Sequence, residues 1–191
     1  MNIAVIGTGR IGTALGGAWN SARHTVVFGS RNPGGEKSGI PVVSYGEAVG
    51  GSEVVVFAIP GSAMESTVAD MNLDAKTIID CTNGGDSSER TTVQMIRDAA
   101  PSAVVAKAFN TLGFENFDNP LFGKNRPDLL YVSSNENRTA IIEELISQVG
   151  LVPVRLGDLG AVGLLDLATR FWFGLAGVFG RHVTYKILRD E

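Results

Sequence analysis

The sequence predicts one doubly wound α/β unit with a parallel sheet and a short carboxyl-terminal helical segment. Three observations favour this fold class. Apolar, β-branched runs without polar alternation recur along the chain, as in strands that are covered on both faces. Segments of helical character separate these runs over most of the length. A glycine-rich turn at residues 7–12 joins the first run to the first helical segment.

Seven apolar runs are expected to be strands, at residues 3–6, 25–28, 54–59, 77–80, 103–106, 129–132 and 152–156. The short run 41–43 either adds a strand or lines a loop. Between the strands we expect helices at residues 11–21, 45–49, 63–71, 88–99 and 136–149. Ser87 and Asn135 are candidate amino-terminal caps for the last two helices. Residues 1–156 then form the nucleotide-binding domain, and residues 157–191 form a helical appendage of the same compact unit.

Residues 110–128 depart from the alternation of strands and helices. This segment directly follows a predicted strand and contains three phenylalanines and two prolines, Phe114, Phe117, Phe122, Pro120 and Pro127. A loop of this length in a compact domain is usually functional or packs as an ordered lid.

The tail, residues 157–191, contains a helical pattern of large apolar side chains. These are Leu164, Leu165, Leu167, Ala168, Phe171, Trp172, Leu175 and Phe179. We expect most of them to pack in the core, although apolar residues on more than one face also indicate a subunit interface and a homodimer. Asp166 and Arg170 interrupt the stretch 164–179, which we expect to be too short to span a membrane.

The amino-acid composition argues against several classes of binding partner and site. A formal net charge of −4 gives no reason to expect a nucleic acid or an anionic membrane. Cys81 is the only cysteine, so no internal disulfide can form, and a reducing compartment is expected. One cysteine and two well-separated histidines cannot build a typical metal cluster. The sequence enters its first strand at once, and we therefore expect a cytoplasmic protein without a targeting segment.

The glycine turn is the most informative motif and reads Gly7-Thr8-Gly9-Arg10-Ile11-Gly12. A strand, a glycine turn and a helix in this order bring backbone N–H groups and a positive helix end to a phosphate, as in Rossmann-type dinucleotide sites. In such a site Gly7 allows the tight turn, Gly9 lets the pyrophosphate approach, and Gly12 lets the helix lie close to the sheet. The bare pattern is also compatible with an ordinary tight connection.

The end of the second strand indicates which dinucleotide binds. An NAD site carries an acidic residue there for the ribose hydroxyl, whereas this chain has Gly29-Ser30-Arg31-Asn32. A hydroxyl and a guanidinium suit a 2′-phosphate, because the planar fork of Arg31 can bind two oxygens. The sequence therefore predicts NADP(H).

Polar residues follow three other predicted strands, at the edge where ligands bind in open α/β sheets. Asn83 and Asn110 are candidates for hydrogen bonds to the nicotinamide carboxamide or to a second ring, and Pro60 for an apolar wall. The alternative is equally open: Asn83 only forms part of the Asn-Gly turn at 83–84, and Pro60 only ends a strand.

Acid–base groups are scarce. His24 precedes the second strand at the opposite edge and is expected to be structural, and His182 lies in the tail. Lys107 is expected to be a solvated strand-end charge, and Cys81 a small core residue. We therefore assign no catalytic side chain, since hydride transfer between two stacked cofactors mainly needs orientation.

The chain resembles the NADPH-dependent coenzyme F420 reductases over nearly its whole length. The matching pieces are residues 3–12, 29–32, 58–60, 105–111 and 180–188. The Gly-Ser-Arg-Asn and Lys-Ala-Phe-Asn pieces are more specific than the glycine turn, and are similar to the NADPH-binding cytosolic domain of six-transmembrane metalloreductases.

The resemblance implies roles for individual residues. Thr8, Ser30 and Arg31 would hold the 2′-phosphate, and Arg10 and Ile11 would cover the pyrophosphate. The nicotinamide would be contacted by Ile59, Pro60, Ala108 and Asn110. The F420 deazaflavin would lie over that ring, close to Asn110, Thr111 and Leu112. One departure from the family is the Asn-Pro-Gly-Gly after Arg31, where the second helix is nearly absent.

The first functional hypothesis is therefore a reductase that moves hydride between NADP(H) and a second planar cofactor, with coenzyme F420 as co-substrate. The alternatives are a flavin or ferric reductase, and an NADPH-binding module or sensor without turnover of a free acceptor. An imine or small-carbonyl reductase would need a helical substrate domain that 191 residues do not provide unless a dimer builds it.

Overall fold

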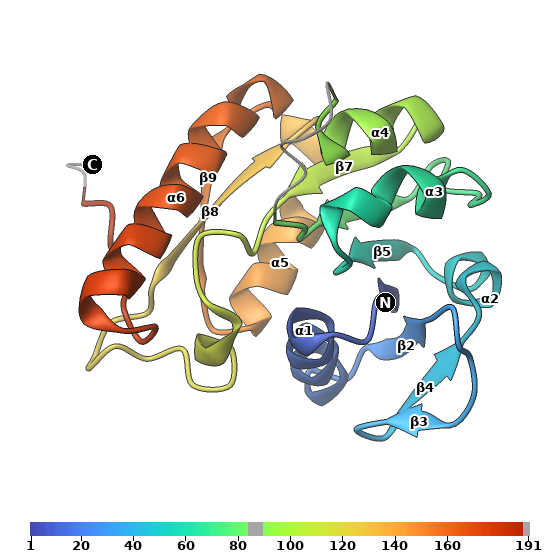
Figure 1. The fold of residues 1–191 in the computed structure, drawn as a ribbon, viewed down its shortest axis with the longest axis horizontal. Helices are drawn as coiled ribbons and strands as arrows, with labels where there is room; N and C mark the ends of the chain where they lie inside the picture. Colours follow the sequence, from blue (N-terminus) through green and yellow to red (C-terminus); the bar gives the residue numbers. More distant parts are fainter. Residues whose placement is uncertain (84–89, 189–191) are drawn as a thin grey trace.

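The computed structural model describes residues 1–83 and 90–188 of the chain. Their strands form a sheet with the order β3-β4-β2-β1-β5-β6-β7-β8-β9 (Figure 1). The strand bounds are β1 (Asn2–Ile6), β2 (Thr25–Gly29), β3 (Glu36–Lys37), β4 (Ile40–Val43), β5 (Val54–Phe57), β6 (Thr77–Asp80), β7 (Val104–Lys107), β8 (Asp128–Ser133) and β9 (Val152–Gly157). Every predicted strand is present, and the run 41–43 is a strand.

The sheet is doubly wound around β1. From β1 the chain proceeds outward to β2 and β4 on one side, and to β5, β6 and β7 on the other, all parallel to β1 or to each other. The order therefore reverses at β1, which places the ligand crevice beyond the carboxyl ends of β1 and β5.

The sheet is mainly parallel, as predicted, and two pairs outside its central strands are antiparallel. β8 pairs with β7 in the antiparallel direction, and the short β3 pairs antiparallel with β4. The physical reason at β8 is the connection, because residues 108–127 hold only a 3₁₀ turn and no crossover helix that could return the chain to the start of a parallel strand. After β8, the crossover through α5 (Ala140–Gln148) makes β9 parallel to β8.

Helices cover both faces of the sheet (Figure 1). The other helices are α1 (Arg10–Ser21), α2 (Tyr45–Gly50), α3 (Met64–Val68), α4 (Thr92–Ala99) and α6 (Val162–Phe179). One buried cluster joins Trp19 of α1 to Leu145 of α5. A second cluster joins residues of α2, α3 and α4 to Leu165 of α6 on the other face. All strand residues of β1 after Asn2 are fully buried between these layers, which explains their continuous apolar run.

Helix starts differ from the expectations in three places. The helix predicted at 63–71 begins as the 3₁₀ turn η1 (Gly61–Ala63) and ends at Val68. α4 begins at Thr92, where the Thr91 side chain accepts a hydrogen bond from the Gln94 N–H, and the expected cap Ser87 lies outside the described residues. Asn135 caps the 3₁₀ turn η3 (Glu136–Arg138) and not α5.

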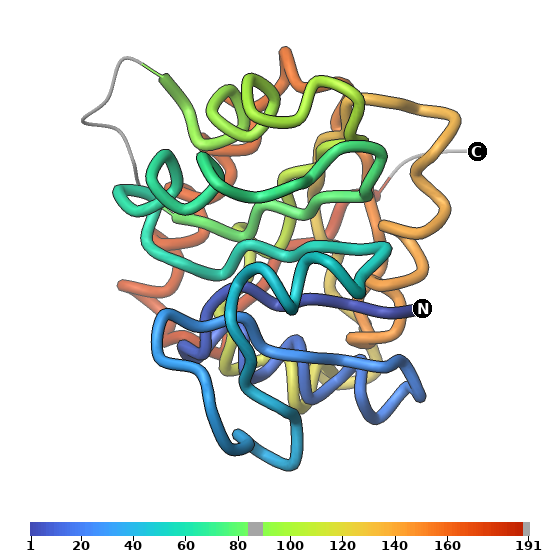
Figure 2. The backbone as a smooth tube through the Cα atoms, turned by 90° about the vertical axis from the view of Figure 1, so that its right-hand side faces the viewer, coloured from blue at the N-terminus to red at the C-terminus, as the bar shows by residue number. Residues whose placement is uncertain are grey.

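No helix separates β2 from β4. The glycine-rich segment after Arg31 instead leads into the β3–β4 hairpin, which projects at the lower end of the molecule in Figures 1 and 2. Gly34, Gly35 and Gly39 all have positive φ, which explains why this segment bends back instead of forming a helix.

The expectation that most apolar residues of the tail pack in the core was wrong. After the 3₁₀ turn η4 (Leu159–Ala161), α6 buries Val162, Leu165 and Trp172. Most of its other large apolar side chains are between 47% and 74% exposed, namely Leu164, Leu167, Phe171, Phe173, Val178 and Phe179. The helix is also longer than the apolar stretch 164–179, which we expected to be too short to span a membrane. The helical stretch Leu159–Phe179 spans 21 residues, which by length and composition alone is enough to cross a membrane, and 22% of its most apolar part is buried in the protein.

Candidate functional site

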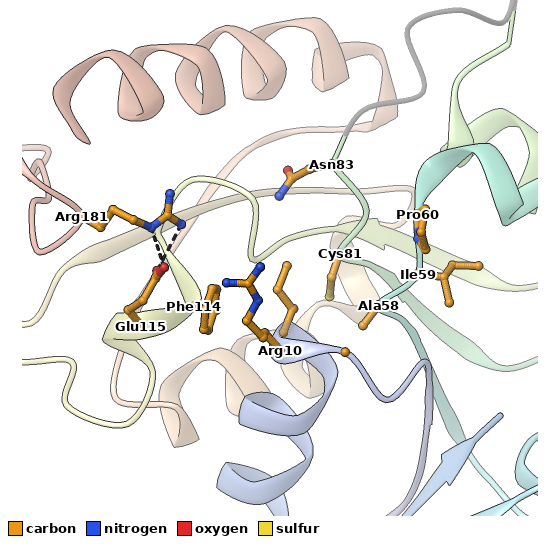
Figure 3. A pocket seen from close by; sticks show the side chains of 11 residues that line it. Arg10, Ala58, Ile59, Pro60, Cys81, Asn83, Phe114, Glu115 and Arg181 are labelled. Carbon is orange, nitrogen blue, oxygen red and sulfur yellow. Dashed lines mark hydrogen bonds and ion pairs between the residues drawn. The ribbon is translucent and has the colours of Figure 1, made fainter. Parts of the chain in front are cut away.

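A pocket of about 510 Å³ lies at the carboxyl edge of the sheet (Figure 3). It is bordered by the glycine turn, the ends of β5 and β6, the loop after β7 and the start of the carboxyl-terminal tail. The lining residues are Gly9, Arg10, Ile11, Ala58, Ile59, Pro60, Cys81, Asn83, Phe114, Glu115 and Arg181.

The glycine turn has the geometry of a phosphate cradle. Gly7 has a φ of +112°, and a Cβ there would lie 2.5 Å from the Ala58 carbonyl oxygen; a Cβ on Gly12 would lie 2.3 Å from the Gly7 carbonyl oxygen. A Cβ on Gly9, by contrast, would meet no atom within 4 Å, so the surface of this residue is open. No side chain caps the first turn of α1, which leaves its amide groups available to an anion.

Arg31 is exposed beyond β2 and makes no hydrogen bond or ion pair within the described part of the chain. Its neighbour Ser30 is held by two contacts. The Ser30 N–H donates to the Val43 carbonyl at 3.0 Å, and Ser30 Oγ accepts from the Asn32 N–H at 3.1 Å. A rigid hydroxyl and a guanidinium without a protein partner in the described residues thus lie past the second strand.

Lys37 is a residue that sequence reasoning missed. Its ammonium group donates to the Thr8 carbonyl oxygen, which also accepts from Thr13 Oγ1 at 3.3 Å. With Arg10, Lys37 lines a second cavity of about 490 Å³ that adjoins the first. The signal that could have identified Lys37 is the turn-rich segment 32–39. This segment has too few helix-forming residues for a crossover helix, so it bends back toward the glycine turn.

The opposite end of the pocket has apolar and amide walls. Ile59 and Pro60 follow β5, and Cys81 and Asn83 follow β6. Burial raises the pKa of the Cys81 thiol, and the nearby Asp80 carboxylate adds to this rise, so the group is a neutral thiol. This agrees with the expected inert core residue, although the side chain also lines the pocket.

Asn110 lies one layer behind the pocket wall. Its Nδ2 donates to the Thr82 carbonyl at 2.7 Å and to Asn83 Oδ1 at 2.9 Å, while its Oδ1 is buried without a hydrogen-bond partner among the described residues. Ala108, Thr111 and Leu112 are also buried and do not line the pocket. The turn at 83–84 lies partly outside the described residues.

The expectation that Lys107 is solvated was wrong. Its side chain is 8% exposed and pairs at 3.0 Å with Asp80, which is fully buried. Lys107 Nζ also donates to the Thr82 carbonyl at 3.0 Å, and Asp80 accepts from the N–H and the hydroxyl of Thr82. The strand order places β6 beside β7, and this brings two charges together that lie 27 residues apart.

The third side of the pocket comes from Phe114, Glu115 and Arg181, to which the sequence analysis gave no role in the site. The Arg10 guanidinium lies over the Phe114 ring, 5.3 Å from its centroid. Arg181 donates from both Nε and Nη2 to the Glu115 carboxylate. Burial raises the pKa of Glu115, but the hydrogen bonds from Arg181 and the positive charges of Arg181 and Arg10 outweigh it, and the pKa is lowered.

Residues 180–188, which we call the strap, hold the loop after β7 in place. His182 Nδ1 lies 2.7 Å from Asn116 Oδ1, and its ring stacks on Phe122 at 4.2 Å. Trp172 of α6 donates to the Val183 carbonyl, and Lys186 pairs with the buried Asp128. His182 is therefore part of the strap. His24 contacts the amino terminus and Gln148 and is structural, as predicted.

The titratable side chains among the described pocket residues are Arg10, Cys81, Glu115 and Arg181. Two are permanent cations, one is a neutral thiol and one is a paired carboxylate. This set can bind anions and position planar rings, and it supplies no general acid poised near neutral pH.

Comparisons with known proteins give a family match and a fold match. Residues 2–84 match the family model described as NADP oxidoreductase coenzyme F420-dependent. A putative F420-dependent NADP reductase from Arthrobacter sp. FB24 has the same fold, with a TM-score of 0.86 and 22% identity over 99% of this chain and 100% of that one. A hypothetical protein from Sinorhizobium meliloti is 26% identical, with a TM-score of 0.74 over 85% of this chain and 88% of that one.

A reductive aminase from Aspergillus terreus, solved with NADPH, has a TM-score of 0.72 and 21% identity. It covers 93% of this chain, which spans only 62% of that protein. Taken together, the family match over residues 2–84 and the shared Rossmann-type fold support an NADP-dependent oxidoreductase.

Proposed function

We propose that this protein transfers hydride between NADP(H) and a second planar redox cofactor, with coenzyme F420 as that cofactor. The observation that carries the proposal is one pocket that combines an open, uncapped phosphate cradle with stacking walls and, among its described residues, lacks a proton donor poised near neutral pH. Such a pocket suits hydride transfer between two rings, where orientation supplies most of the catalysis.

The residues at the ends of β1 and β2 fit the phosphates of NADP(H). The uncapped amides of α1 and the open face of Gly9 suit the pyrophosphate, covered by Arg10 and Ile11. Arg31, which has no protein partner in the described residues, would pair with the 2′-phosphate beside Ser30 and Thr8. Lys37 at the Thr8 carbonyl adds a second cation to this end.

The residues at the ends of β5 and β6 fit the nicotinamide. Ile59 and Pro60 offer an apolar wall, and Asn83 offers amide groups on the other side (Figure 3). The Oδ1 of Asn110, unpaired among the described residues, is an acceptor that would be satisfied by a carboxamide N–H after a small movement of Asn83, because buried acceptors are normally paired. When bound, NADPH supplies the hydride.

Phe114, Glu115 and Arg181 line the remaining side, where the second ring would enter. Thr111 and Leu112 lie behind this side and would support the ring without direct contact. The family match and the fold neighbour described as a putative F420-dependent reductase support coenzyme F420 as the occupant. The competing proposal, which comes from the sequence motifs alone, is that a flavin or a ferric chelate is the acceptor.

The deciding experiment is an anaerobic turnover assay. The purified protein is mixed with NADPH and F420, and the visible absorbance of the deazaflavin is followed together with NADPH absorbance. We expect both to fall together, and to recover when F420H2 and NADP are supplied instead. Parallel assays use a flavin, a ferric chelate and a cyclic imine.

The outcomes separate the candidates. Rapid flavin or ferric reduction without F420 turnover would replace F420 by that acceptor. Turnover of the imine would point to the chemistry of the aminase fold neighbours. Tight NADPH binding without turnover of any acceptor would indicate a binding module or sensor.

A further inference from the structure

The Arg181–Glu115 pair forms the end of the pocket that lies opposite Pro60 (Figure 3). Arg181 Nε donates to one oxygen of the Glu115 carboxylate, and Nη2 donates to the other oxygen at 3.1 Å. The two side chains are 47% and 35% exposed, so a molecule in the pocket can reach both of them. The pair therefore presents a positive and a negative group side by side to a ligand.

Three contacts hold this pair in one orientation. The Arg181 guanidinium lies over the indole ring of Trp172, 5.2 Å from its centroid. Asn116 Nδ2 donates to the Arg181 carbonyl oxygen at 3.0 Å and so fixes the backbone at the start of the strap. Glu115 Oε2 lies only 2.5 Å from where a Cβ on Gly113 would be, so the carboxylate packs closely on that glycine. This preorganisation lowers the entropy that a ligand loses when it binds to the pair.

The pair retains hydrogen-bonding capacity that its own contacts do not use. A guanidinium has five N–H donors, and Arg181 gives two of them to Glu115, while the other three have no partner among residues 1–83 and 90–188. A carboxylate has about four acceptor sites, and the bonds from Arg181 occupy two of them. Although burial raises the pKa of Glu115, the hydrogen bonds from Arg181 outweigh it, so the group stays an acceptor at neutral pH. Donors and an acceptor are thus adjacent in the pocket.

This pattern suits an uncharged cyclic imide better than an anion. The imide edge of a flavin or a deazaflavin has an N–H group between two carbonyl oxygens. The N–H can donate to Glu115 while a neighbouring carbonyl oxygen accepts from Arg181. A phosphate or carboxylate would instead approach the Glu115 carboxylate together with the guanidinium, and like charges side by side are unfavourable. Such an anion would have to displace Glu115 and break both hydrogen bonds of the pair.

We propose that the Arg181–Glu115 pair recognises the imide edge of the second ring, with Glu115 accepting from the ring N–H and Arg181 donating to a ring carbonyl. The inference rests on the proposed function, because it needs a second planar cofactor beside the nicotinamide. It narrows that cofactor to rings with a cyclic imide, which flavins and deazaflavins carry and ferric chelates and cyclic imines do not. A ring without the N–H binds less well, since it leaves the carboxylate without its partner.

A pair of uncharged probes tests this assignment. Lumiflavin and 3-methyllumiflavin share one tricyclic ring, but in the second a methyl group replaces the imide hydrogen. The fluorescence of each probe is followed as the protein is added in the presence of saturating NADP⁺, so that binding is measured without turnover. We expect lumiflavin to bind roughly tenfold more tightly than 3-methyllumiflavin, as for the loss of one hydrogen bond to a charged group.

Variants of the pair separate its two roles. Glu115→Met should remove the preference for lumiflavin and hardly change the affinity for 3-methyllumiflavin, which has no N–H to donate. Arg181→Met should weaken both probes by a similar factor, because both keep the ring carbonyls. Unchanged circular dichroism shows that each variant is folded.

Glu136→Met is the matched control. Glu136 also pairs with an arginine, Arg155, but it follows the antiparallel strand β8 and therefore lies at the other edge of the sheet. This variant should leave the affinities for both probes unchanged.

Riboflavin and FMN test the anion alternative, because the two molecules differ only in a phosphate group. We expect Arg181→Met to weaken both by the same factor. Tighter binding of FMN to the wild type that is lost in Arg181→Met would overturn the proposal and assign the pair to an anionic group.

Three results with the uncharged probes would also overturn the proposal. These are equal affinities of the two probes for the wild type, a preference that survives Glu115→Met, and a lack of binding of both probes. The outcome is separable from that of the proposed function. Turnover of F420 without an imide preference would leave the proposed reaction standing and refute this assignment. An imide preference with turnover of a flavin alone would support this assignment and replace F420.

Discussion

At the scale of single residues, the Lys107–Asp80 pair helps to fix the backbone that lines the pocket. Lys107 and Asn110 both donate to the Thr82 carbonyl oxygen, the first at 3.0 Å and the second at 2.7 Å. This shared acceptor fixes the backbone between Cys81 and Asn83, which line the pocket. Asp80 also accepts from Thr92 at the start of α4, so the pair joins both described sides of the 84–89 segment.

We predict that Lys107→Met destabilises the protein by about 3–5 kcal/mol, because the buried Asp80 carboxylate loses its partner. Urea unfolding measures this loss. The double variant Lys107→Met/Asp80→Asn should recover part of it, since no charge is then left unpaired. Lys124→Met is the control at an exposed lysine and should change little. An equal cost for both lysines would show that the pair does not stabilise the fold.

The second prediction at this scale concerns Arg31. Arg31→Ala should weaken NADPH binding roughly 10- to 150-fold, because a hydrogen bond to a charged group contributes about 1.5–3 kcal/mol. NADH binding should hardly change, because NADH lacks the 2′-phosphate. Calorimetry with both nucleotides measures the difference.

The control for Arg31 is Arg138→Ala, an exposed arginine after the antiparallel strand β8 and therefore at the other edge of the sheet. It should leave both affinities unchanged. Equal losses for NADPH and NADH in Arg31→Ala would mean that Arg31 does not read the phosphate.

At the scale of elements, the strap and the loop after β7 form one side of the pocket together. The Glu115–Arg181 pair and the His182–Asn116 contact join them across 66 positions in sequence. Arg181 also lies over the Trp172 ring of α6, 5.2 Å from its centroid. α6, the strap and the loop are therefore expected to respond together when one contact is removed.

We predict that Glu115→Gln destabilises this assembly by less than about 1 kcal/mol, because both partners are partly exposed and screened by solvent. The pKa of Glu115 is lowered in the folded protein, so the pair stabilises fully above the usual carboxyl pKa and is lost as pH falls through the lowered pKa. Unfolding free energies of both proteins, measured from neutral to acidic pH, should converge at the acidic end. A constant difference at all pH values would contradict this account.

At the scale of the whole molecule, nucleotide binding should stabilise the fold. The cradle and the walls come from β1, β2, β5 and β6, which are central in the sheet. We predict that NADPH at about 100 times its Kd adds about 2.7 kcal/mol, which corresponds to a rise in Tm of roughly 5–10 °C for a chain of this size.

Differential scanning calorimetry with NADPH and with equal concentrations of NADH measures this rise. NADPH should stabilise more than NADH, and Arg31→Ala should remove most of the difference. Equal shifts for the two nucleotides in the wild type would remove the support for a 2′-phosphate site.

Much of the fold could be predicted because local patterns dictate it. The apolar runs became strands, most of which are buried, and the missing helix after Arg31 follows from its glycines with positive φ. The direction of β8 could not be predicted, since it depends on whether the loop before it crosses the sheet. Periodicity alone also could not separate the buried side of α6 from the exposed one, because both are apolar.

For the candidate site, too, one part could be predicted from the sequence and another part could not. The sequence by itself determined the strand–glycine–helix cradle and the hydroxyl and guanidinium after β2, because each depends on neighbouring residues and on backbone geometry. Only the tertiary structure decided that Lys107 is buried against Asp80, that Lys37 reaches Thr8 and that Arg181 and Glu115 complete the pocket. These contacts join residues 27 to 66 positions apart, and such pairs meet only when strand order and chain return bring their elements together.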